Sequence, residues 1–175
     1  QNIVLNGLGS ATVTTPVLTV SSTYSLVSVT STGTPVCSQA QTGSAIVSVI
    51  ALPFATISGT TSICSGSTTV ITFNGTPNAT VTYTINGGSN QTIVLDGTGF
   101  ASLTTPFLTV NTTYDLVSVA TSGIPGCSQA QTGSAIVTIS ATPTATISGT
   151  TTICSGNTAT ITFTGTPNAT VTYTV

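Results

Sequence analysis

Four cysteines and two aspartates are the side chains of this chain that could do chemistry. Thiols form disulfides, bind metals or act as nucleophiles, and carboxylates act as acids, bases or calcium ligands. The sequence contains no Lys, Arg or His, and its two acidic residues are both aspartates. Because a nucleophilic thiol or hydroxyl needs a neighbouring base, we expect no catalytic residue and no enzyme activity.

The spacing of these residues also argues against a metal site. The cysteines contain no CxxC pair and there is no histidine to join them. Asp96 and Asp115 alone cannot surround a calcium ion, which takes about six to eight oxygen ligands. We therefore expect no metal and no cofactor. The absence of Lys and Arg also predicts that nucleic acid is not a partner, since phosphates require cations.

Disulfide formation is the chemistry that the cysteines favour. Two cysteines in each small β unit are typical of oxidising, extracellular settings, and the alternative is buried free thiols in a cytosolic protein. The simplest pair, Cys64 with Cys127, closes a loop of about 64 residues and would stabilise the fold by about 4 kcal/mol. Cys37 and Cys154 would then find their partners outside this segment.

A repeat of 90 residues positions all of these groups. Residues 1–85 align with residues 91–175 without a gap, and 59 of the 85 positions are identical. Cys37 matches Cys127, and Cys64 matches Cys154, whereas the aspartates are replaced by Asn6 and Ser25. Gap-free copies predict an array of similar units, and the chain is expected to be a segment of something longer.

Prolines mark the expected domain boundaries. Pro53 and Pro143 lie at the same phase of the repeat, each after a run of strand-forming residues. We expect the C-terminal part of one domain in residues 1–52, a complete domain in residues 53–142, and the N-terminal part of the next in residues 143–175.

The complete domain is predicted to be all-β, an immunoglobulin-like β-sandwich. In residues 80–85 Val81 and Tyr83 alternate with threonines, which is the period of a half-buried strand. Seven short strands separated by turns are typical of such sandwiches. The expected strands A to G are Ala55–Gly59, Thr69–Phe73, Thr80–Ile85, Thr92–Leu95, Ala101–Thr104, Tyr114–Ala120 and Ser134–Ser140.

This strand order creates a difficulty for the preferred Cys64–Cys127 pair. Cys64 falls between strands A and B and Cys127 between F and G, and in a simple sandwich these loops lie at opposite ends. A short or displaced strand A would bring Cys64 to the F–G region. Otherwise, each A–B cysteine could pair with the F–G cysteine of the following domain.

Two further positions have expected structural roles. Asp96-Gly97 is a strong signal for a tight hairpin, and Asn6-Gly7 is expected to do the same in the other copy. Tyr114 and Tyr24 stand at the start of strand F, where many sandwiches have a tyrosine corner. The alternative for both tyrosines is an ordinary position in the core.

Several motifs resemble a known family of repeats. They are Ile63-Cys64-Ser65-Gly66, the run of residues 75–84, Gly126-Cys127-Ser128 and the run of residues 133–137. The chain resembles the tandem immunoglobulin-like repeats of giant Bacteroidota cell-surface adhesins, in particular flavobacterial gliding-motility adhesins. The resemblance implies type IX secretion, an outer-membrane-anchored extracellular location, and partners in the gliding or secretion machinery through regions not present here.

Three functions follow as hypotheses. The preferred one is a non-enzymatic stalk or filament, in which neighbouring repeats are the partners and an extracellular surface or polysaccharide is the target. The second is a module that binds glycans or a substratum, although the chain has no Trp. The third is an ice-binding surface built on threonine rows such as Thr80, Thr82 and Thr84.

Overall fold

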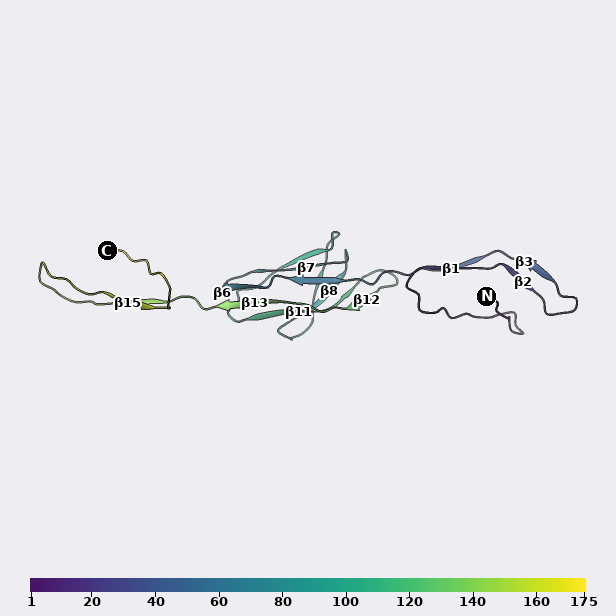
Figure 1. The fold of residues 1–175 in the computed structure, drawn as a ribbon, viewed down its shortest axis with the longest axis horizontal. Coiled ribbons are helices and arrows are strands. Elements are labelled where there is room, and N and C mark those ends of the chain that lie inside the picture. Colours follow the sequence, from purple (N-terminus) through teal and green to yellow (C-terminus); the bar gives the residue numbers. More distant parts are fainter. The chain divides into compact units, whose positions relative to one another are not determined.

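The computed structural model describes all 175 residues and contains 15 β-strands and no helix (Figure 1). The prediction of an all-β chain is therefore confirmed. The chain divides into two compact units, Gln1–Ala51 and Leu52–Val175. The division lies one residue before the predicted boundary after residue 52, whereas the predicted boundary after residue 142 falls inside the second unit.

Residues 53–140 form two sheets. The smaller sheet has the order β10-β7-β5, from Phe100–Thr104, Val70–Gly75 and Ala55–Ser58. The larger sheet has the order β6-β13-β11-β8-β9, and β12 pairs with β11 beside this path. Its strands are β6 Thr61–Cys64, β13 Ser134–Ser140, β11 Thr112–Ala120, β8 Thr80–Ile85, β9 Gln91–Val94 and β12 Ser128–Ala130.

One hydrophobic core lies between these two sheets. The alternating apolar residues of each strand point inward, so that Phe73 from the smaller sheet and Val81, Tyr114 and Val137 from the larger sheet are almost fully buried. The rings of Phe73 and Tyr83 pack with their centroids 5.1 Å apart. Every residue of the core cluster lies between Ala55 and Val137, so this part of the chain encloses a core of its own.

A strand that was not predicted follows the first predicted one. β5 pairs antiparallel with β7, but after Gly59 and Thr60 the chain enters β6, which pairs parallel with β13 in the other sheet. Gly59 has a φ of 122°, and a Cβ atom there would lie 2.7 Å from the Val70 carbonyl oxygen. This glycine allows the chain to leave one sheet and join the other.

Two other details differ from the predicted strand list. The predicted hairpin between residues 92–95 and 101–104 does not form, because β9 pairs with β8 whereas β10 pairs with β7. β12 was not predicted. It pairs with the last three residues of β11, whereas β13 pairs with the first four. The bounds of β8 and β13 agree with the predicted ones.

The strands outside residues 53–140 are β1 to β4 and β14 to β15. Their bounds are Ser22–Ser25, Ser28–Thr30, Ser38–Ala40 and Ser44–Val47 in the first unit, and Ala145–Ser148 and Thr162–Gly165 in the second. Their pairings reproduce those of the complete sheets at a shift of 90 residues. Tyr24 pairs with Ala45 as Tyr114 pairs with Ala135, and Ala145 pairs with Gly165 as Ala55 pairs with Gly75.

Candidate functional site

Cys64 lies at the end of residues 53–140 from which the chain leaves. It is the last residue of β6 and pairs with Ser140, the last residue of β13. The following turn is fixed by two backbone hydrogen bonds, from Ser65 N–H to the Ser140 carbonyl and from Gly66 N–H to the Leu108 carbonyl. The Cys64 side chain is exposed. We call this end the exit end.

Cys127 lies at the opposite end, where the chain enters. β11 runs from the exit end and finishes at Ala120, which pairs with Ser128 of β12. Cys127 is the next residue outward, with its N–H donating to Thr121 Oγ1 at 3.1 Å and its carbonyl accepting from Thr121 N–H at 2.9 Å. We call this end the entry end, and Figure 1 shows β6 and β12 at opposite ends of these sheets.

The predicted disulfide between Cys64 and Cys127 is therefore wrong in this structure, where all four cysteines are free. A short or displaced first strand was the condition for bringing the two thiols together. The first strand forms at its predicted residues as β5, and the additional strand β6 runs parallel to β13 and carries Cys64 to the exit end. The nine residues of β11 separate the two ends, which corresponds to about 27 Å at the strand rise.

Asp96 organises the connection between the two sheets. Its Oδ1 atom accepts hydrogen bonds from the N–H groups of Thr98 and Phe100, at 2.8 and 3.0 Å, and from the Thr98 hydroxyl at 2.6 Å. The bond from the Thr98 hydroxyl, followed by the backbone bonds, lowers the pKa of the Asp96 carboxyl group. Asp96 thus closes a turn, which is the kind of role that was predicted for it.

The predicted reason for this turn needs correction. Gly97 does not have a positive φ; the residue that does is Gly99, with a φ of 83°. The turn is a loop between sheets rather than a two-residue hairpin. Asn6 makes the matching bonds in the first unit, with Oδ1 accepting from Leu8 N–H and Ser10 N–H at 2.9 and 3.0 Å. An uncharged amide oxygen therefore makes the same turn.

The two tyrosines differ in burial. Tyr114 is 1% exposed and lies in the core, where burial, followed by the nearby Tyr83, raises the pKa of its hydroxyl group. The structure contains no hydrogen bond from this hydroxyl to the backbone, so it favours the core position over the predicted tyrosine corner. Tyr24 is 38% exposed and likewise makes no such bond.

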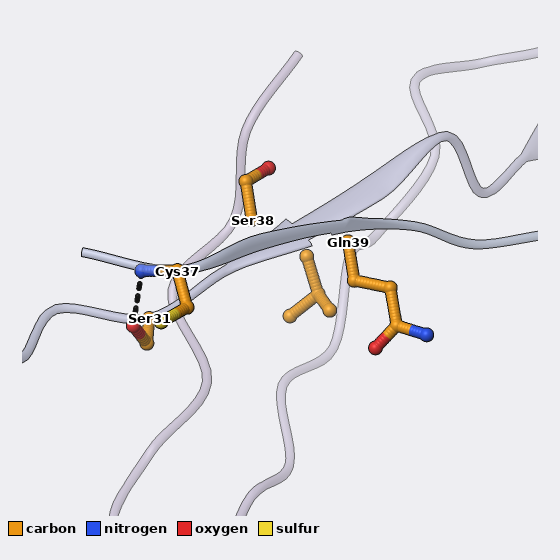
Figure 2. Close-up of a pocket in the computed structure, with 5 residues that line it drawn as sticks. Ser31, Cys37, Ser38 and Gln39 are labelled. Atoms are coloured by element: carbon orange, nitrogen blue, oxygen red, sulfur yellow. Dashed lines mark hydrogen bonds between the residues drawn. The ribbon is translucent and has the colours of Figure 1, made fainter. Parts of the chain in front are cut away.

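Two hollows of the surface are lined in part by residues whose counterparts lie in the core. One of about 400 Å³ is lined by Val29, Ser31, Cys37, Ser38 and Gln39 (Figure 2). Ser31 Oγ accepts from Cys37 N–H at 3.0 Å there, as Thr121 does for Cys127. Val29 is 46% exposed, whereas Val119, its counterpart, is fully buried beside β8. We therefore interpret this hollow as a face that lacks its covering strands.

A second hollow has the same character. It is lined by eight residues, which include Phe163 and Tyr173, whose ring centroids lie 5.2 Å apart. Their counterparts Phe73 and Tyr83 are buried in the core. Neither hollow contains a charged residue or a tryptophan, and no three His, Cys, Asp or Glu residues gather anywhere in the structure.

Comparisons with known proteins add no family. No family model matches the chain, and no curated protein matches it significantly. None of the elements of this structure is a helix capable of crossing a membrane.

Proposed function

We propose that this chain is a structural segment of an extracellular array, in which each immunoglobulin-like β-sandwich of about 90 residues adds one unit of length. The observation that supports the proposal most strongly is the shared register. Three separate strand pairings recur at a shift of 90 residues, and the hydrogen-bonded turn at Asp96 recurs at Asn6.

What fails to recur also supports a structural role. The aspartates become Asn6 and Ser25 in the other copy, and the exposed aromatic Phe54 becomes Thr144. A binding or catalytic function would require its polar or aromatic groups in each copy that performs it. The strands, turns and cysteines recur instead, and these residues shape and join the units.

The entry and exit ends are suited to joining units in series. The chain enters through Pro53, which is buried, and leaves after Ser140 at the far end of the same two sheets. Only Ala141 to Thr144 separate β13 from β14. A short connection that contains Pro143 restricts the angle between successive units, because proline has a fixed φ.

The identity of the parent protein belongs to the same proposal. The motifs around Cys64 and Cys127 resemble those of Bacteroidota surface adhesins, so we place the array in the stalk of such an adhesin. Secretion, anchoring and gliding would then depend on other regions of that protein. The absence of Lys and Arg suits an exposed stalk, since it leaves no cleavage site for trypsin-like proteases.

Small-angle X-ray scattering tests the proposal. Proteins with one, two and three copies of residues 53–142 in series should increase in maximum dimension by a constant step with each copy. A maximum dimension that stays close to that of one copy would contradict a stalk. The same proteins applied to immobilised glycans test the alternative module, and specific binding by a single copy would favour that alternative.

A further inference from the structure

Each copy has one cysteine at each of its two ends, and each of these cysteines could form half of a cross-link to a neighbouring copy. Cys64 is exposed at the exit end, beside the residue from which the chain continues to the next copy. Cys127 is half-buried at the entry end and is followed directly by β12.

We propose that the exit-end cysteine of each copy forms a disulfide with the entry-end cysteine of the next copy. This inference rests on the proposed array.

The lengths of the connecting segments agree with this bond. Ser140, the partner of Cys64, precedes Ala145 by five residues, which span about 17 Å when extended. Ala55, the counterpart of Ala145, donates its N–H to Gln131 Oε1 at 3.4 Å. Cys127 precedes Gln131 by four residues, which extend from the level of Ala55 toward the preceding copy for about 13 Å.

The exit-end cysteine of one copy and the entry-end cysteine of the next copy would therefore lie at nearly the same level along the array. The difference between these lengths is about 4 Å, and a disulfide needs a Cα–Cα separation of about 4.4–6.8 Å. Two apolar side chains are exposed near the exit end, because Phe107 and Val110, which flank the Leu108 that bonds to Gly66, are 77% and 64% exposed. Val17 and Val20 keep these positions apolar in the other copy, as contact with a following unit would require.

This connectivity also explains the four free thiols. Cys64 would bond to an entry-end cysteine that follows residue 175, and Cys127 to an exit-end cysteine that precedes residue 1. Cys37 and Cys154 are in the same situation, since they are the counterparts of Cys127 and Cys64. No two cysteines of this segment are partners in such an array, and the structure pairs none of them.

The bond requires an oxidant of ordinary extracellular chemistry. Two thiols lose two protons and two electrons as the S–S bond forms. The electrons reduce the disulfide of an exchange partner, such as an oxidised thiol–disulfide oxidoreductase or oxidised glutathione, to two thiols. The reaction passes through a mixed disulfide, and the exposed Cys64 is the accessible site for forming it.

Cross-links of this kind would prevent the array from extending under force. From Cys127 the chain passes along β13 and β14 to Cys154, and the next disulfide leads to the following copy. A force carried along this path passes two copies through only the residues between Cys127 and Cys154 and one disulfide. Without disulfides, the force must pass through every residue of two whole repeats to cover the same two copies. Much of the path already consists of extended strands, so little length remains to be released.

Counting thiols in a protein with two copies of residues 53–142 in series tests the proposal. These residues enclose a core of their own, and the protein contains four cysteines. After treatment with oxidised glutathione and alkylation, mass spectrometry of the monomer should find two cysteines outside any protein disulfide, each either alkylated or carrying glutathione. A count of zero would indicate pairs within each copy, and a count of four would indicate no bond. Either result would overturn the proposal.

Matched variants identify the bonded pair. Cys127→Ser in the first copy with Cys64→Ser in the second leaves the predicted partners, and this variant should form one disulfide within the monomer. Cys64→Ser in the first copy with Cys127→Ser in the second has the same composition and should form no disulfide within the monomer. A disulfide within the monomer of the second variant, or its absence in the first, would contradict the assignment.

A longer array provides a mechanical readout. In single-molecule stretching of eight copies, the fully extended length per copy should be about sevenfold shorter for oxidised than for reduced protein, because the extended length of a chain is proportional to the number of residues that bear the load. Equal extension would overturn the proposal. X-ray scattering of the reduced array separates this failure from that of the proposed function, because an elongated array does not require the disulfides.

Discussion

Residues 22–47 and residues 112–137 have the same strand register but different surroundings. Tyr24 and Tyr114 make corresponding pairings, yet they are 38% and 1% exposed. Val29 and Val119 differ in the same way, at 46% and 0%. Neighbouring strands and their connecting turns form the same register in both places, whereas burial also requires the remaining strands of the two sheets. The 90-residue repeat thus provides matched positions that differ mainly in burial.

The largest expected effect separates two phenylalanines. Phe73 is fully buried against Tyr83, while Phe163 makes the same ring contact with Tyr173, which is 63% exposed. Phe73→Ala should lower the free energy of unfolding by about 4 kcal/mol, because it leaves a cavity in the core. Urea denaturation followed by tyrosine fluorescence measures this loss.

Phe163→Ala is the matched control for this change. Its effect on the same transition should stay below about 1 kcal/mol, since little surface is buried around the ring. Equal losses for the two variants would show that residues 143–175 are packed as tightly as the core. That result would remove the difference in burial on which the comparison is based.

A second comparison concerns two glycines at the same turn. Gly99 and Gly9 both have positive φ, at 83° and 73°. A Cβ atom on Gly99 would lie 2.1 Å from the Gly75 carbonyl oxygen, whereas Gly9 has nothing within 4 Å. Gly99→Ala should cost about 3 kcal/mol from overlap and backbone strain, and Gly9→Ala about 1 kcal/mol from strain alone.

Thermal unfolding followed by circular dichroism measures both glycine variants. A loss for Gly99→Ala no larger than that for Gly9→Ala would mean that the turn moves away from β7 at little cost. The close approach of the two strand ends would then contribute nothing to the connection between the sheets.

Local patterns in the sequence predicted the strands better than their partners. Residues 80–85 and 134–140 combine alternation with clear limits, and β8 and β13 agree with the prediction. β6 was missed because Ile63 is its only aliphatic residue and its partner β13 lies near the other end of the domain sequence. The location of Cys64 depends on that distant pairing, so the sequence left both disulfide hypotheses open.

Turn chemistry was predicted in kind but not in detail. Asp96 was expected to favour a hairpin through the glycine that follows it. Its side chain instead caps a wider loop, and the positive φ falls on Gly99. The Asp-Gly signal describes a local tendency, whereas the loop here must also cross between two sheets, which only the complete fold determines.

The next comparison tests the role of a buried hydroxyl. Since no backbone group bonds to the Tyr114 hydroxyl, Tyr114→Phe should change the free energy of unfolding by less than about 0.5 kcal/mol at pH 7. A tyrosine corner would predict a loss above about 1 kcal/mol, from the broken hydrogen bond. Denaturation in urea distinguishes the two results.

The same tyrosine predicts a dependence on alkaline pH. Burial raises the pKa of the Tyr114 hydroxyl, so the folded state holds this proton more tightly than the unfolded state. Stability should be unaffected below the unfolded pKa of about 10 and should fall as the pH rises above it. The fall should be smaller in Tyr114→Phe, and an equal fall would assign it to other groups such as Tyr83.

The smallest expected effect distinguishes Asp96 from Asn6. Hydrogen bonds to the ionised carboxylate lower the pKa of Asp96 in the folded state. Its contribution to stability is therefore present above the unfolded pKa of about 3.9 and is lost as the pH falls through the folded value. Asp96→Asn should remove this dependence while the turn remains, because Asn6 makes the same backbone bonds at the same position.

Unfolding of Asp96→Asn measured between pH 2 and 7 tests this prediction, with Asn6→Asp as the reciprocal variant. If Asp96→Asn kept the full acid dependence, the carboxylate would not be its source.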